Sequence, residues 1–240
     1  MVQALLALVS VTVLALTRRR RRNRLPARAV IVSPPRSTSI ARDGAVRSAQ
    51  CAELTMSRAD LERLWNATNL ENLARTYWRF LSRVTLGLIR VVYGDNERSV
   101  VLLARPLTLL RFDAPEYHIE PDHGSVRWRI RDGLLVARAG RGSGYLAIDV
   151  QRRDDEAPEI PPGHTKLRIE VEVANFYPAI AAGFSTPVYE ATQSSIHVLV
   201  THAFLRSLAK LQLAPSKVGR LAAAVQALQD ADRSSRIARR

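Results

Sequence analysis

Residues 125–173 constrain the fold of this chain most, because their apolar and polar residues alternate with the two-residue period of a β-strand. The first run alternates aliphatic or aromatic residues with arginines: Val126, Arg127, Trp128, Arg129, Ile130, Arg131. Asp132-Gly133 is typical of a tight hairpin turn, so residues 134–136 are predicted to return as the partner strand. Two further runs place one-sided apolar residues at Leu146, Ile148, Val150, Leu167, Ile169, Val171 and Val173. The stretch predicts an antiparallel meander with one buried face.

The residues before this meander predict a first strand, two short helices and several more strands. Residues 50–55 are expected to form the first strand, and Ser57 is a suitable N-cap for a helix over residues 58–67. Asn69 is expected to cap the second helix, over residues 70–81. β-Branched and alternating runs then predict strands at residues 84–93, 99–103, 107–112 and 116–120.

After the meander, residues 187–211 predict one long amphipathic helix, because apolar residues recur every three or four positions until Pro215. A curved antiparallel sheet with one apolar face needs a cover, and this helix is the only predicted element long enough to provide it. The predicted fold class is therefore α+β. It is a curved antiparallel β-meander of about six to seven strands, wrapped on a long C-terminal helix, with two short helices after the first strand.

The positive charge of the chain is concentrated at its two ends. The formal net charge is +14, of which residues 1–50 carry +9 and residues 213–240 carry +4, leaving +1 for residues 51–212. The central region is nearly neutral, and no aromatic residues interleave the run of arginines near the N-terminus, which together argue against nucleic acid as a partner. The single cysteine, Cys51, excludes an internal disulfide framework and a Cys-based zinc site.

The N-terminal residues predict a membrane anchor. Residues 2–17 carry no charge and would span about 24 Å as a helix, at roughly 1.5 Å per residue. Their positive charge follows the apolar run instead of preceding it, so cleavage as a signal peptide is not expected. Five arginines stand next to the apolar run, where they are predicted to contact anionic lipid headgroups and to remain in the cytoplasm: Arg18, Arg19, Arg20, Arg21 and Arg22. A mis-assigned start codon and a buried core helix are the alternatives.

These features divide the chain into four predicted parts. Residues 1–17 are the single-pass anchor, and residues 18–48 are a basic linker rich in Arg and Pro. Residues 49–212 form the globular domain on the cytoplasmic side, and residues 213–240 are a basic tail.

The order of these elements resembles the helix-grip fold of the START and Bet v 1-like superfamily, which includes the polyketide cyclase/dehydrase-like proteins. The resemblance rests on the residue 50–55 strand leading into the segment from Ser57 to Trp65, then on the hairpins and the closing helix. It covers roughly residues 49–212. The resemblance implies a cavity between the sheet and the long helix that holds a lipid, a polyketide or another apolar ligand. No cofactor is predicted.

Under this resemblance the inward faces of the strands and of the last helix would line the cavity. The candidate lining residues are Trp128, Ile130, Leu146, Ile148, Ile169, Val171, Tyr177, Ile196 and Leu199. At each of these positions, packing in a solid core is the competing interpretation.

The sequence offers no recognisable catalytic or metal-binding motif. The five histidines, His118, His123, His164, His197 and His202, lack the spacing of a zinc-binding helix, so no metal site is predicted. Ser194 and Ser195 lack the context of a nucleophile elbow.

The first functional hypothesis is therefore a membrane-anchored domain that binds or carries a hydrophobic ligand without catalysis. The second is a cyclase-like or aromatase-like enzyme, in which a few polar residues perform acid–base chemistry: Tyr145, Tyr177, Tyr189 or Arg138. The third is a protein-interaction module with a solid core, held at the membrane. The sequence carries no signal for the oligomeric state.

Overall fold

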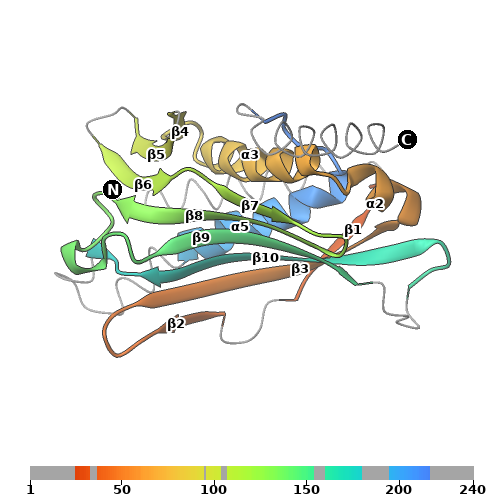
Figure 1. Ribbon diagram of the computed structural model, residues 1–240, viewed down its shortest axis with the longest axis horizontal. Helices are drawn as coiled ribbons and strands as arrows, with labels where there is room; N and C mark the ends of the chain where they lie inside the picture. The colour runs from red at the N-terminus through yellow and green to blue at the C-terminus, as the bar shows by residue number, and fades with distance from the viewer. Residues whose placement is uncertain are drawn as a thin grey trace, which may run out of the picture.

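A computed structural model describes residues 25–32, 37–94, 96–103, 107–153, 160–179 and 195–216 of the 240-residue chain. The described part is a single antiparallel sheet of ten strands with its main helices, α2, α3 and α5, on one side. In Figure 1, α5 lies behind strands β8 to β10, and α3 runs along the top of the view. The predicted α+β class and antiparallel sheet are confirmed, but the sheet has ten strands instead of six or seven.

The sheet has the order β1-β3-β10-β9-β8-β6-β5-β4, and β2 and β7 pair with β3 and β8 outside this path. Neighbouring strands run antiparallel throughout. The strands are β1 (Arg28–Ile31), β2 (Thr38–Ile40), β3 (Val46–Ser57), β4 (Ile89–Tyr93), β5 (Glu97–Leu102), β6 (Thr108–Asp113), β7 (Glu116–Ile119), β8 (His123–Asp132), β9 (Tyr145–Arg153) and β10 (His164–Phe176).

Two helices follow β3, as predicted. Helix α2 (Arg58–Leu64) begins after Ser57, whose hydroxyl accepts a hydrogen bond from the backbone N–H of Asp60 at 3.0 Å. Helix α3 (Ala67–Val84) is capped by Asn66 instead of Asn69, because the Asn66 side chain accepts the Asn69 N–H at 2.9 Å. It is 18 residues long, so it absorbs the start of the strand expected at residues 84–93 and is not a short helix.

The chain closes with helix α5 (Ser195–Ser207) and a 3-10 turn, η4 (Leu208–Lys210). Residues 187–194 of the long helix predicted over residues 187–211 lie outside the described residues. Helix α5 packs against β1, β3 and α3. Together, α3 and α5 cover the apolar face of the sheet that the alternating sequence predicts.

An aromatic cluster fills the middle of the core. The Trp78 ring lies 5.2 Å from Trp128 in an edge-on arrangement and 5.3 Å from Phe112. Tyr77 makes the corresponding edge-on contact with Phe204 of α5, also at 5.2 Å. These rings join the sheet to both helices, because Trp78 and Tyr77 are adjacent on α3 and face different partners.

The hairpin expected at Asp132-Gly133 is not formed. Strand β8 ends at Asp132, and the next residues run beside β6, where Leu134 and Leu135 donate backbone hydrogen bonds to Thr108 and Leu109. Gly133 has φ 144° and lies against the backbone of Leu109. The glycine therefore allows the backbone to approach β6 closely. Such a contact with another strand cannot be predicted from the local sequence.

The sheet begins earlier than the expected domain boundary at residue 49. Strands β1 and β2 lie within the predicted linker of residues 18–48, and both pair with β3. The alternation in these segments is too short to distinguish an added strand from an extended linker, so only the pairing with β3 identifies them. No helix in the described ranges is long and apolar enough to cross a bilayer, and the predicted anchor at residues 2–17 lies outside those ranges.

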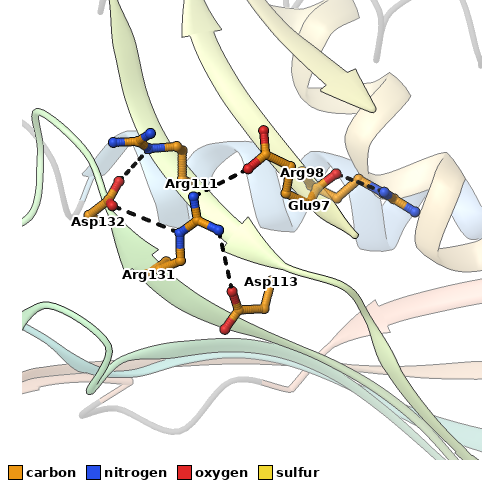
Figure 2. Close-up of polar contacts among 6 residues, drawn as sticks. All are labelled: Glu97, Arg98, Arg111, Asp113, Arg131 and Asp132. Carbon is orange, nitrogen blue, oxygen red and sulfur yellow. Dashed lines mark hydrogen bonds and ion pairs between the residues drawn. The ribbon is translucent and has the colours of Figure 1, made fainter. Parts of the chain in front are cut away.

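Two outward arginines of β8, Arg127 and Arg131, contact side chains of neighbouring strands. Figure 2 shows Arg131 between Glu97 at 3.3 Å, Asp132 at 3.9 Å and Asp113 at 4.0 Å, with Arg111 on the other side of Asp132. Arg127 stacks over the ring of Tyr145. On β10, Glu170 pairs with Arg168, and Glu172 pairs with Arg47. These contacts are largely exposed, so they satisfy the charges and add little stability.

Candidate functional site: an apolar cavity at one end of the sheet

An apolar cavity of about 80 Å³ lies between the sheet and the helices, near the junction of α2 and α3. The sheet contributes residues from β3, β7, β8, β9 and β10, and the helical side contributes α2, α3 and the segment after α5. The lining is aliphatic apart from Trp65 and two asparagines: Leu54, Met56, Leu61, Leu64, Trp65, Asn66, Asn69, Leu70, Leu73, Ile119, Gly124, Val150, Leu167, Ile169, Leu208, Leu211 and Leu213.

Strand β8 leaves room for the cavity because it has a glycine where a side chain would point inward. A Cβ atom at Gly124 would lie 3.7 Å from Leu70 and 4.0 Å from Trp65, both of which line the cavity. Two residues further along the same face is Val126, which is fully buried. A glycine within a strand often marks such an open position, because it adds no side chain to the space in front of it.

Trp65 forms one side of the cavity and is held in place from the outside. Its indole N–H donates to the carbonyl oxygen of Glu120, in the turn between β7 and β8, at 3.1 Å. The guanidinium of Arg152 lies over the ring at 5.5 Å and forms a 2.6 Å ion pair with Glu62 of α2. The indole is therefore fixed between α2 and the β7–β8 turn, although it is only partly buried.

The segment after α5 forms the opposite side. Leu211 has a left-handed backbone, φ 53°, which is uncommon for leucine and turns the chain out of η4. The following backbone is attached to α3, since the N–H of Ala214 donates to Thr76 at 2.7 Å and that of Ser216 to Asn72 at 2.8 Å. These bonds hold Leu211 and Leu213 against the cavity.

The cavity contains no group suited to acid–base or metal chemistry among the described residues. Its two polar lining residues, Asn66 and Asn69, are occupied at the start of α3, where the Asn66 side-chain oxygen accepts from the Asn69 N–H and Asn69 accepts from the Asn72 side chain at 3.3 Å. An apolar cavity of this kind excludes water and accepts apolar groups.

The structure places the predicted cavity residues mostly elsewhere. Only Ile169 of the nine lines this cavity. Five others are buried in the solid core: Trp128, Ile130, Leu146, Ile148 and Val171. The side chains of Ile196 and Leu199 lie outside the described residues, as do Arg18, Arg19, Arg20, Arg21 and Arg22.

The polar residues considered for catalysis are not at the cavity. Tyr177 donates to Asp43 at 2.7 Å, and this bond raises the pKa of the phenol and lowers the pKa of the carboxyl. Tyr145 donates to Glu172 at 3.0 Å on the outer face of the sheet, where burial, followed by that carboxylate, raises its pKa. Arg138 lies in a 3-10 turn, η1 (Arg138–Gly140), and Tyr189 is outside the described residues. Both phenols are protonated at neutral pH, because the ordinary pKa of tyrosine is already near 10 and both shifts are upward.

The sequence predicts which faces of the strands point inward, but it does not predict which part of these faces borders the cavity. The alternating apolar residues of β8, β9 and β10 were expected to point inward, and they do. The signal that could have located the cavity is Gly124, the one position on this strand face that lacks a side chain.

No protein-family model and no curated protein matches this chain. Among solved structures, a protein from Arthrobacter aurescens is similar at 14% identity and a TM-score of 0.30, covering 70% of this chain and 90% of that one. Ara h 8.0201 is similar at 10% identity and a TM-score of 0.26, covering 69% of this chain and all of that one. Human STARD10 is similar at 8% identity and a TM-score of 0.26, covering 80% of this chain and 78% of that one.

These likenesses concern the fold alone, and at such TM-scores they carry no argument about function. In the chain itself, a long strand leads into two helices, further antiparallel strands and a closing helix, which is the element order on which the predicted resemblance to START and Bet v 1-like proteins rests.

Proposed function

We propose that this protein binds the end of a narrow apolar molecule, such as a lipid acyl chain, in the cavity beside Gly124. The observation that carries the proposal is the lining, which is apolar apart from Asn66 and Asn69 at the start of α3 and joins the sheet to both helical segments. Burying an apolar group in such a site is favourable by roughly 25 cal/mol per Å² of surface removed from water.

The size of the cavity narrows the ligand class. Pockets for drug-sized molecules usually measure about 300–1,000 Å³, whereas this cavity measures about 80 Å³. Only a slender part of a ligand fits, so the remainder would lie at the surface. Several lining residues are half-buried and mark the side where the ligand would leave: Leu64, Trp65, Ile119, Leu211 and Leu213.

The position of the N-terminal segment supports a membrane as the source of the ligand. The backbone N–H of Ala27 donates to Ala209 at 3.1 Å, and Arg28 pairs with Thr55 of β3, between the cavity residues Leu54 and Met56. The chain therefore enters the sheet at the same end as the cavity. We propose that residues 2–17 anchor the protein in a bilayer with this domain on the cytoplasmic side.

Exposed basic residues at this end fit the same proposal. Arg28, Arg58 and Lys210 are exposed. Each lies beside an element that lines the cavity: Arg28 pairs with β3, Arg58 begins α2, and Lys210 ends η4. Cations near an anionic membrane surface contribute on the order of 1 kcal/mol each. Together with Arg18 to Arg22, they would keep the cavity end near lipid headgroups.

The test uses the full chain in native membranes and a palmitate analogue that carries a photoreactive diazirine at its terminal carbon. After irradiation, labelled peptides should map to lining segments such as those containing Leu70 and Leu211. A Gly124→Val variant should lose this label because its side chain fills the cavity, whereas Ala147→Val, which adds similar volume on the outer face, should keep it. Equal labelling of the Gly124→Val variant would contradict the proposal.

The anchor is tested separately. If residues 2–17 are inserted, detergent should release the protein from membranes and high salt should not. Deleting Arg18 to Arg22 should weaken retention or disturb the orientation. Release of the intact protein by salt alone would contradict insertion.

A further inference from the structure

On the outer face of the sheet, the turn between β7 and β8 gathers two histidines and a carboxylate. His118, Glu120 and His123 each offer a ligand atom, and these atoms all lie within 4.8 Å of one another. The Nε2 atom of His118 is 2.8 Å from Oε1 of Glu120. Two ligands of a tetrahedral zinc ion, with bonds of about 2.0–2.2 Å, lie roughly 3.3 Å apart, so these groups are near coordinating distance.

The hairpin explains why these residues meet although their spacing is not that of a metal-binding helix. His118 pairs with Ser125 across the two strands, and His123 stands two residues before Ser125 on the same face. The two histidines are therefore diagonal neighbours, with ring centroids 5.9 Å apart. The turn itself is closed by a 2.7 Å bond from the Glu120 N–H to the His123 carbonyl.

Two neighbouring contacts fix the turn and its histidine. Nε2 of His123 lies 2.6 Å from Oδ2 of Asp149 on β9. A carboxylate that holds one ring nitrogen of a histidine commonly orients the other ring nitrogen toward a metal ion. The carbonyl of Glu120 accepts the Trp65 indole N–H at 3.1 Å, which ties the turn to α2.

The three side chains are accessible to solvent, and the groove beside them carries more carboxylates than guanidiniums, which favours the binding of a cation. The side chains of His118 and Glu120 are 57% and 53% exposed, and that of His123 is 30% exposed. His118 and His123 also line an outer groove of about 510 Å³. The charged groups of that groove, apart from the histidines, are four carboxylates and two guanidiniums: Glu116, Asp149, Glu170, Glu172, Arg127 and Arg168.

We propose that His118, Glu120 and His123 form a binding site for a divalent transition-metal ion, with Asp149 as the positioning residue for His123. Imidazole and carboxylate donors suit Zn²⁺, Co²⁺, Ni²⁺ or Cu²⁺, whereas Mg²⁺ and Ca²⁺ prefer an all-oxygen site. Three protein ligands leave coordination positions open to water or an added ligand, and the outer groove provides space beside them. This site is independent of the apolar cavity, which lies on the inner face.

The test is metal binding by the full chain, purified in detergent without a histidine tag and freed of metal. Co²⁺ is titrated with its visible absorption as the readout, and Zn²⁺ is titrated by calorimetry. One ion should bind per chain, with no competition from Mg²⁺. His118→Ala and His123→Ala should each weaken binding by at least about tenfold, and Asp149→Asn by about tenfold, the lower end of the effect of removing an orienting carboxylate.

The matched control is His164→Ala, which removes an exposed histidine at the start of β10 and should leave binding unchanged. Because the ligands are on the surface, all variants should unfold at a temperature close to that of the wild-type protein, and excess Zn²⁺ should stabilise only the variants that retain the site. The site is refuted if the wild-type protein does not saturate at one ion per chain. It is equally refuted if the His118→Ala and His123→Ala variants bind as tightly as the wild-type protein, or if His164→Ala weakens binding as much as they do. Unchanged binding by Asp149→Asn would refute the role of Asp149.

Discussion

The space between the sheet and its helices is filled differently at its two ends. In the middle and toward the β6 side, aromatic rings interlock, and Trp128 and Phe112 are 1% and 2% exposed. Toward α2, aliphatic side chains and Gly124 surround a cavity of about 80 Å³. Large rigid rings fill a curved sheet completely, whereas leucines around a glycine leave a gap. The same fold thus combines a solid core with an open end.

The largest expected difference between the two ends comes from their tryptophans. Trp128→Ala should lower the free energy of unfolding by about 3–5 kcal/mol, because it removes a buried ring from a close-packed cluster. Trp65→Ala should cost about 1–2 kcal/mol, since that ring is only half-buried beside an existing cavity. Urea denaturation of both variants checks the ranking, and equal losses would contradict the division into solid and open ends.

A matched pair of isoleucines sharpens the comparison. Ile148 and Ile169 lie on adjacent strands and are 0% and 3% exposed, but only Ile169 lines the cavity. Ile148→Ala should cost about 3–4 kcal/mol and Ile169→Ala about 2 kcal/mol, because the second side chain loses fewer packed neighbours. The midpoints of urea denaturation measure the difference in stability, when the free energy of unfolding falls with urea concentration at the same slope in both variants. A larger loss for Ile169→Ala would show that the cavity is not open to that side chain.

A partly buried polar contact between α5 and β3 should make the stability of the fold depend on pH. His202 of α5 lies 2.6 Å from the side-chain oxygen of Gln50 on β3, and burial, then Arg206, lowers the pKa of the imidazole. The unfolded chain, with an ordinary pKa near 6.5, therefore takes up a proton more readily than the folded chain. This contribution to stability is present above about pH 6.5 and is lost as the pH falls through the lowered pKa.

Unfolding curves between pH 7.5 and pH 5 test this dependence against a His202→Gln variant. The variant should lose less stability than the wild-type protein over that interval, because its side chain does not titrate. Identical pH slopes for the two proteins would exclude His202 as the cause.

The smallest expected effect is a gain in stability from a substitution at the open end. Gly124→Ala should stabilise the protein by about 0.5–1 kcal/mol, since the backbone is not left-handed and the methyl group would meet Leu70 at 3.7 Å. Gly140→Ala is the contrast, because its methyl group would lie 2.3 Å from Cβ of Tyr177. Thermal unfolding should show opposite signs for the two variants, and a loss at Gly124 would mean that the space is not available.

The strands and helices that carry a clear sequence period are predictable from the sequence alone. The alternation from Val126 to Ile130 predicts a strand with one buried face, whichever strand it pairs with. Ser57 caps α2 by accepting a hydrogen bond from a residue only three positions further along the chain. The closing helix and the two helices after the first long strand followed in the same way, and their order was enough to indicate a helix-grip fold. These features are determined by interactions between residues close together in the sequence, so sequence patterns are enough to predict them.

The site depends on contacts between distant residues, so only the tertiary structure determined it. Which apolar residues pack solidly and which surround a cavity depends on how Gly124 meets Leu70 and Trp65, from elements more than fifty residues apart. His118 and His123 come together because a hairpin folds one beside the other. Alternation in the sequence determined which side chains face inward, whereas the volumes of side chains brought together from different strands and helices determined where space remained.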